Sequence, residues 1–336
     1  MLNGHGDDIY AHSKKIVSNF SSNVYHKFDS SDLEKYLCSH ISAIHSYPEP
    51  DARTLRDIIS KTLDISTGEI CITNGATEAI YLIAQLFRAS KTAVIIPTFS
   101  EYEDACRIHM HQLYFVDSPD HIEPDTRLVW LCNPNNPTGK IYDADYLHQV
   151  ISNHPRTYFV IDESYAGFTN QKVWTAKEGL RYKNTIVLHS LTKCYAIPGL
   201  RLGYITASDE LIGQIMHYSM PWSVNQIAQL AGQYLLQNTT YDFSKCIDES
   251  RKVQKMISSI NGIEVIPSDM HYFLCRLNRG KAADLKRFLI DNYGILIRDA
   301  ANFRGLDDRY FRIAIQSPEE NLQLVKALET WIKHRH

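Results

Sequence analysis

The feature that most constrains the fold is a regular alternation of short apolar runs and amphipathic segments between residues 69 and 206. The runs at 128–131 and 158–161 are apolar at every position, as expected for parallel strands buried on both faces. Segments with helical spacing of apolar residues lie between such runs. The pattern predicts an α/β fold with a mostly parallel, doubly wound sheet. In such sheets the ligand binds at the carboxyl ends of the strands.

The same signals predict the other elements of this part. Strands are expected at residues 70–73, 92–96, 112–116, 185–188 and 202–206, and helices at 54–63, 76–88, 99–109 and 146–151. Residues 29–32 supply helix caps, and the spacing of Leu33, Leu37, Ile41 and Ile44 predicts an earlier helix with one apolar face.

After residue 225 the chain becomes mainly helical. Helices are expected at 226–237, 241–260, 282–292 and 318–336, and strands at 262–267, 272–277 and 310–315. This arrangement predicts a smaller α+β C-terminal domain. We therefore expect a large domain at residues 46–245, and a small domain built from residues 1–45 and 246–336 that includes an N-terminal arm.

Composition excludes several classes of protein. A net charge of −3 with 22% charged residues gives no sign of a nucleic-acid or anionic-membrane partner. The N-terminus carries acids rather than an apolar core, so we expect no signal peptide, and no apolar run is long enough to span a membrane. The seven cysteines include no C-x-x-C pair. We predict no disulfide, no metal site and a cytoplasmic location.

One lysine lies in an unusual setting after the strand at 185–188. Lys193 follows Ser190 and Thr192, and Arg201 comes after a Pro-Gly turn. A lysine in a turn is most often a solvated surface charge. Hydroxyls with a guanidinium suit a phosphate, however, and a lysine held against them could form a Schiff base with an aldehyde.

Polar residues follow three other strands, and each has an ordinary structural alternative. Gly75, Ala76 and Thr77 begin a helix whose free N–H groups suit a phosphate, although a capped strand-to-helix turn is the commoner explanation. Asn136 lies in a proline-rich turn that would hold its amide rigidly. Asp162 ends an apolar strand, where a carboxylate is costly unless paired; it could also be a helix N-cap.

Together these motifs resemble the pyridoxal-phosphate enzymes of the aspartate-aminotransferase fold, known as fold type I. The resemblance covers nearly the whole chain and is most specific in the segment with Lys193. It implies that Lys193 holds the cofactor aldehyde and later acts as general acid/base. The implied cofactor-binding residues are Gly75, Ala76, Thr77, Ser190, Thr192 and Arg201 at the phosphate, Asp162 at the pyridine nitrogen, Asn136 and Tyr165 at O3′, and Tyr102, or else Phe99, stacked on the ring.

The resemblance also implies a partner and a substrate. Tyr47 matches a tyrosine that reaches the phosphate of the neighbouring subunit, which implies a homodimer with shared active sites. Arg312 matches the arginine that grips the substrate α-carboxylate, and Arg298 one that binds a distal phosphate. His5 is assigned to the substrate as well, although composition alone favours a frayed arm over residues 4–10.

Within the family the chain resembles the branch of histidinol-phosphate aminotransferases and threonine-phosphate decarboxylases. The segments 4–7, 19–23, 74–78, 97–102, 221–225 and 302–306 favour the decarboxylases, which make aminopropanol phosphate for cobalamin. His271 is a departure, since the branch usually has asparagine there. We predict decarboxylation of L-threonine-O-3-phosphate, with aminotransfer as the alternative. An alternative of another class is a ligand-sensing domain, but this sequence shows no attached DNA-binding segment or basic patch.

Overall fold

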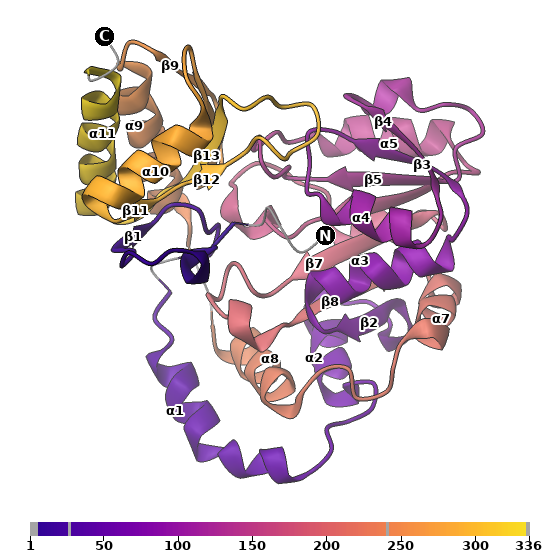
Figure 1. Cartoon of the computed structure of the whole chain (residues 1–336). Coiled ribbons are helices and arrows are strands. Elements are labelled where there is room, and N and C mark those ends of the chain that lie inside the picture. Colours follow the sequence, from indigo (N-terminus) through magenta and orange to yellow (C-terminus); the bar gives the residue numbers. More distant parts are fainter. Residues whose placement is uncertain (1–5, 26–27, 240–241, 334–336) are drawn as a thin grey trace.

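The computed structural model describes residues 6–25, 28–239 and 242–333, and Figure 1 shows two parts, each built on a sheet. Within these residues the larger sheet has seven strands. Their order is β2 (Ile70–Thr73), β8 (Gly203–Ala207), β7 (Thr185–Ser190), β6 (Tyr158–Asp162), β5 (Leu128–Cys132), β3 (Lys91–Ile95) and β4 (Gln112–Val116). Only β8, among these described strands, runs antiparallel to its neighbours. The predicted α/β fold with a mostly parallel sheet is confirmed.

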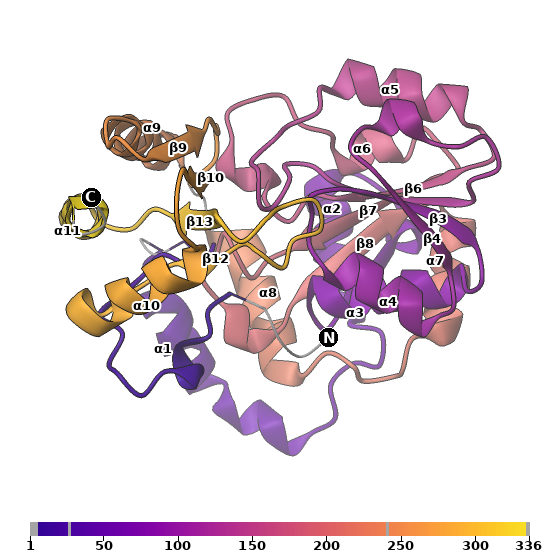
Figure 2. The same cartoon turned by 45° about the horizontal axis from the view of Figure 1, so that its top comes forward.

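Helices cover both faces of this sheet (Figure 2). On β5, Leu128, Trp130 and Cys132 pack into the core shared with α3 (Gly75–Leu86), whereas Val129 and Leu131 pack toward α5 (Ala144–Asn153). This alternation follows from the two-residue period of a strand. The α3 side also carries α4 (Glu101–Ile108), and α6 (Ala176–Gly179) lies on the α5 side. α2 (Arg53–Leu63) and α7 (Asp209–Tyr218) pack at the β2–β8 edge.

The smaller sheet is antiparallel, in the order β12 (Arg298–Asp299), β13 (Tyr310–Ala314), β10 (Tyr272–Leu277) and β9 (Ile263–Ile266). It lies beside α9 (Ser244–Ser258), α10 (Ala282–Tyr293) and α11 (Pro318–Lys333) (Figure 1). β1 (Ser18–Asn19) pairs in parallel with β11 (Ile295–Leu296). α1 (Ser31–Ser39) packs on α8 (Gln226–Asn238), where Tyr36 and Tyr234 stack with ring centroids 4.7 Å apart. The domain limits at residues 45 and 245 remain predictions.

Two helices differ from the expectations. The helix expected to continue to Ile44 ends at Ser39, a 3₁₀ segment (Ile41–His45) follows, and Ile41 and Ile44 are exposed rather than buried. α7 was not predicted, although Ser208 caps it by accepting a hydrogen bond from the Leu211 N–H. No helix in the described ranges is both long and apolar enough to cross a bilayer.

The N-terminal arm is also not frayed where the structure describes it, from Gly6 onward. The Asp7 N–H donates to Ser21 Oγ at 3.1 Å, and Lys286 Nζ donates to Asp8 Oδ2 at 2.6 Å. The pairing with α10 links residues 278 positions apart, which is why local composition gave no sign of it.

Candidate active site

A cavity of about 110 Å³ lies at the carboxyl ends of the parallel strands, next to the start of α3. Strand periodicity brings its residues together, because β5, β6 and β7 end on the α3 face with Cys132, Asp162 and Ser190, respectively. The lining includes predicted residues from every motif: Ala76, Thr77, Tyr102, Asn136, Asp162, Tyr165, Ser190, Thr192, Lys193 and Arg201. Sequence segments up to 125 residues apart (76 to 201) therefore meet at one site.

Lys193 presents its amine to this cavity from the turn after β7. The turn is fixed at two points: the Tyr25 N–H donates to the Lys193 carbonyl at 3.0 Å, and the Ser190 and Thr192 hydroxyls share a hydrogen bond of 2.8 Å. Burial, followed by repulsion from Arg312 and Arg201, lowers the pKa of Lys193 to about 8. A substantial fraction of neutral, nucleophilic amine is thus present near neutral pH.

A concave, positively charged surface lies between the start of α3 and Arg201. Gly75 has φ +76°, and a Cβ at this position would lie 2.6 Å from Arg201 Nη2. A Cβ on Gly203 would lie 2.7 Å from the Ala76 nitrogen. Two glycines therefore allow the guanidinium and the N–H groups of the first helical turn to converge, which is the geometry of a phosphate site.

Asp162 is buried and paired at the end of β6. The Tyr102 hydroxyl donates to its Oδ2 at 2.6 Å, and the Ser164 N–H donates to Oδ1 at 2.9 Å. Tyr102 is fully buried and stacks on Trp130 with centroids 5.0 Å apart, while Phe99 meets Tyr102 edge-on at 5.9 Å. Both Phe99 and Tyr102 line the cavity, so the choice between them as stacking partner remains open.

Asn136 and Tyr165 are held by residues far away in the sequence. Arg312 Nη1 donates to Asn136 Oδ1 at 2.5 Å, and Arg312 Nη2 donates to the Ser21 carbonyl at 2.6 Å. Asn23 Nδ2 donates to the Tyr165 hydroxyl at 3.3 Å. Burial raises the pKa of Tyr165 to about 12, so this phenol is protonated and can donate a hydrogen bond.

Two arginines face each other on the small-domain side. Arg298 and Arg312 are direct partners on the antiparallel strands β12 and β13, and both are buried. Arg298 Nη2 donates to Asn302 Oδ1 at 2.7 Å, and burial lowers its pKa to about 10. Arg312 Nε is buried without a hydrogen-bond acceptor among the described residues. An anion bound there would satisfy this donor.

One predicted residue lies away from the cavity. Tyr47 is 84% exposed, is not part of the cavity lining, and packs on Trp222 with ring centroids 5.3 Å apart. His5 lies outside the described residues. Sequence analysis gave no role to Ser21, Asn23 or His271. The His271 Nε2 lies 2.9 Å from the Asn23 carbonyl, so the residue that departs from the family pattern supports the segment that holds Tyr165.

The residues present fit a pyridoxal-phosphate cofactor. The cradle that a Cβ at Gly75 would fill suits the phosphate, and the amine of Lys193, which lines the cavity, suits the aldehyde. Asp162 supplies a buried carboxylate for a pyridinium nitrogen, and Asn136 and Tyr165 supply an amide and a phenol for the ring oxygen.

Comparison with known proteins agrees with this geometry. Residues 15–328 match the model of the family "Aminotransferase class I and II". Threonine-phosphate decarboxylase of Salmonella typhimurium is 30% identical over 328 residues, which cover 92% of this chain and 89% of that protein. Histidinol-phosphate aminotransferase of Methanocaldococcus jannaschii is 30% identical over 318 residues, covering 88% and 84%.

A solved structure gives the same result. L-threonine-O-3-phosphate decarboxylase from Porphyromonas gingivalis superposes with a TM-score of 0.92 at 38% identity, covering 94% of this chain and 100% of that one. Sequence, fold and site geometry thus converge, and the chain belongs to the aminotransferase class I and II family of enzymes.

Proposed function

We propose that this chain binds pyridoxal 5′-phosphate through Lys193 and decarboxylates L-threonine-O-3-phosphate, in the branch of metabolism that makes aminopropanol phosphate for cobalamin. The observation that carries the proposal is the buried pair Arg298 and Arg312, because Arg312 donates to Asn136 in the lining of the cavity that contains Lys193. Two guanidinium groups suit a substrate with two anionic groups, a carboxylate and a phosphate.

Each side chain then has a defined task. Arg312 binds the substrate carboxylate, and its hydrogen bond to Asn136 fixes the position of that carboxylate relative to the cofactor ring. Arg298 binds the distal phosphate, with His5 from the N-terminal arm as a further ligand. Lys193 moves protons at the substrate Cα, because its lowered pKa suits both release and uptake of a proton near neutral pH. When bound, the cofactor supplies an electron sink.

The second candidate function is aminotransfer on a phosphorylated substrate. The histidinol-phosphate aminotransferase relative, as similar in sequence as the first decarboxylase, supports it. Both reactions need the same cofactor residues. They differ in which bond at Cα lies perpendicular to the ring, and that depends on the placement of the carboxylate by Arg312.

Turnover of the cofactor-loaded protein tests the proposal. We expect CO₂ release from L-threonine-O-3-phosphate without any keto acid, and none from the Lys193→Ala variant. Turnover of histidinol phosphate that depends on a keto acid, without CO₂, would establish the second candidate instead. Ligand binding without turnover of either compound would favour the sensing domain.

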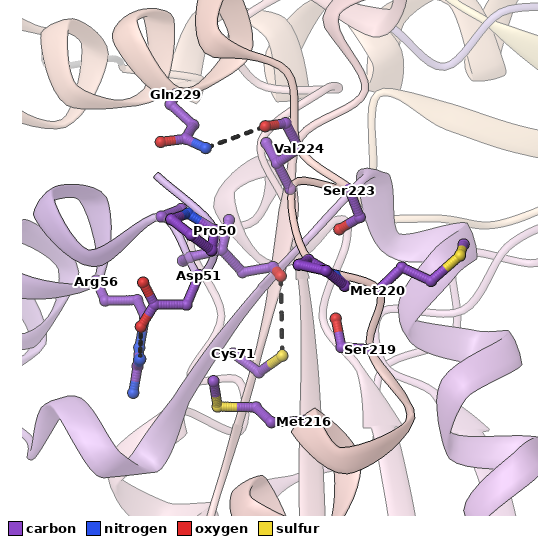
Figure 3. Close-up of a pocket in the computed structure, with 13 residues that line it drawn as sticks. Pro50, Asp51, Arg56, Cys71, Met216, Ser219, Met220, Ser223, Val224 and Gln229 are labelled. Atoms are coloured by element: carbon purple, nitrogen blue, oxygen red, sulfur yellow. Dashed lines mark hydrogen bonds and ion pairs between the residues drawn. The ribbon is translucent and has the colours of Figure 1, made fainter. Parts of the chain in front are cut away.

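We also propose a homodimer with shared active sites. Its support is an exposed apolar patch formed by Tyr47, Met220 and Trp222, which are 84%, 71% and 48% exposed, respectively. Beside this patch lies a second cavity, lined by Asp51, Arg56, Cys71 and the 219–224 loop (Figure 3). Exposed apolar side chains around a cavity are typical of an interface.

The exposed Ile41 and Ile44 lie shortly before Tyr47 in the chain, and a second copy would cover them too. Sedimentation analysis tests the dimer, and Trp222→Glu should shift it toward monomer. Tyr47→Phe should leave the dimer intact but weaken cofactor binding, because only the hydroxyl that reaches the partner's phosphate is lost. We further propose a cytoplasmic location, since all seven cysteines, each within the described residues, are free thiols.

A further inference from the structure

A long loop between β12 and β13 extends from the small sheet to the large one (Figures 1 and 2). At its tip, Arg304 forms a bidentate ion pair with Glu103 of α4. Arg304 Nε donates to Glu103 Oε2 at 2.8 Å, and Arg304 Nη2 donates to Oε1 at 2.7 Å. The hydrogen bonds from Arg304 are the main reason that the pKa of Glu103 is lowered, so the carboxylate is ionised.

Two more contacts join the loop to the large domain. The Arg304 guanidinium lies over the Phe115 ring, 4.1 Å from its centroid. Gly305 adopts φ +89°, and a Cβ there would lie 3.3 Å from Ile96 Cδ1. The tip is therefore held by charge, by an aromatic face and by close backbone packing.

The base of the same loop holds a substrate residue. Asn302 Oδ1 accepts a hydrogen bond of 2.7 Å from Arg298 Nη2, and the buried Phe303 ring lies 5.2 Å from the Arg298 guanidinium. Residues 302–304 thus connect Glu103, which directly follows Tyr102 in α4, to the guanidinium assigned to the distal phosphate.

We propose that the Glu103–Arg304 pair is a positioning device that fixes Arg298, through Asn302 and Phe303, for the phosphate group of the substrate. Neither Glu103 nor Arg304 touches substrate in this account, and the inference rests on the proposed function of Arg298. The pair couples recognition of phosphate to the placement of the small sheet against α4, the helix that carries Tyr102.

Partly exposed ion pairs contribute little to the free energy of unfolding. Arg304 and Glu103 side chains are 45% and 18% exposed, so loss of the pair should change global stability only slightly. Its effect should appear instead as a loss of preorganisation at Arg298, that is, in affinity for a phosphorylated ligand.

The chain offers a matched control for this idea. Arg107 also pairs with Glu103, with Nη2 and Oε1 2.7 Å apart, but it lies one turn along the same helix. We expect Arg304→Met to raise KM for L-threonine-O-3-phosphate about threefold to tenfold at low salt, with kcat within about twofold. Arg107→Met should leave both unchanged. A KM that does not change in Arg304→Met, or that rises equally in Arg107→Met, would overturn the proposal.

A second measurement does not depend on turnover. In the cofactor-loaded protein the cradle at Gly75 and Arg201 is occupied, so added inorganic phosphate reports on Arg298. Calorimetry should show about threefold or weaker phosphate binding in Arg304→Met and unchanged binding in Arg107→Met. Equal affinities in the three proteins would refute the coupling. Absence of threonine-phosphate turnover by the unmodified enzyme would instead refute the proposed function, and the phosphate titration would still decide the role of the pair.

Discussion

Arg298 and Arg312 lie directly opposite each other on β12 and β13, and 7% and 5% of their respective surfaces are exposed. Like charges at directly opposed positions of a sheet repel each other, and here burial removes most of the screening by water. Burial, followed by repulsion from Arg312, lowers the pKa of both Arg298 and Lys193. This repulsion costs stability in the free protein, and an anion bound by both groups, as we propose for the substrate, would offset it.

Replacing Arg298 tests its role in recognising the distal phosphate. We expect Arg298→Met to raise KM for L-threonine-O-3-phosphate by about 30-fold to 100-fold, because hydrogen bonds to a charged group contribute roughly 1.5–3 kcal/mol each. Steady-state kinetics measures this change. Arg309→Met is the control, since Arg309 pairs with Asp307 at a partly exposed site and should leave KM unchanged. A similar KM in the two variants would remove Arg298 from the substrate site.

The lowered pKa of Lys193 predicts how cofactor capture depends on pH. Only the neutral amine attacks an aldehyde. The rate at which the apo-protein takes up pyridoxal phosphate should therefore rise with pH, reach half of its maximum near pH 8 and level off above that. Stopped-flow absorbance measures it. Arg312→Met removes a repelling cation and should move the midpoint upward, whereas a midpoint near 10.5 in the unmodified protein would contradict the burial of Lys193.

The lowered pKa of Lys193 also makes the free energy of unfolding depend on pH, and the sign of this dependence can be worked out. The folded-state pKa lies below the usual 10.5, so between pH 8 and 10.5 the unfolded chain binds more protons at this lysine than the folded chain does. The free energy of unfolding of the apo-protein should therefore rise with pH across this window. Chemical denaturation of Lys193→Met should lack that contribution, on the order of 3 kcal/mol. Equal slopes of the free energy of unfolding against pH in the two proteins would exclude a contribution from Lys193.

Variants of Asp162 and Tyr102 separate the effect of the Asp162 charge from the effect of the hydrogen bond that Tyr102 donates to it. We expect Asp162→Asn to lower kcat by about a hundredfold or more while the phosphate cradle still binds the cofactor, because a neutral amide cannot stabilise a pyridinium. Tyr102→Phe keeps the ring on Trp130 and removes only the hydrogen bond of 2.6 Å, so kcat should fall far less. Equal losses of kcat in the two variants would mean that the charge of Asp162 is not the deciding property.

Replacing Gly75 tests the phosphate cradle, and replacing Gly213, a glycine outside the cradle, is the control. Gly75→Ala should weaken pyridoxal-phosphate binding by about tenfold or more and destabilise the protein by about 1–2 kcal/mol, since φ is +76° and the Cβ would meet Arg201. Gly213→Ala lies in α7 with open space around the new Cβ, and should stabilise by about 0.5–1 kcal/mol without affecting the cofactor. Equilibrium titration and denaturation measure the two effects.

Most of the large sheet was predictable because its strands carry their own signal. The run at β5 is apolar at every position, and the strand observed there, Leu128–Cys132, extends the prediction by one residue. α7 was missed, although Ser208 and the spacing of Leu211, Ile212 and Ile215 offered a signal. The break after α1 could not be seen, because Ile41 and Ile44 keep helical spacing while the chain turns at His40.

The residues of the candidate site also differ in how far the sequence could predict them. Gly75, Asp162 and Lys193 each follow a strand and lie in motifs with a local pattern, and the resemblance of these motifs to the family made them candidates. Ser21 and Asn23 lie in the segment 19–23, which resembles the decarboxylases, but no local pattern showed what they contact, because their contacts with Arg312 and Tyr165 span 291 and 142 residues.

The sequence by itself determined the type of sheet and the chemistry of the residues at its strand ends, because strand period and turn chemistry act over a few neighbouring residues. Only the tertiary structure decided which residues far apart in the chain form hydrogen bonds: Ser21 with Arg312, Asn23 with Tyr165 and Arg304 with Glu103. These contacts depend on the relative placement of two sheets, and that placement is the sum of many weak packing interactions that no short segment encodes.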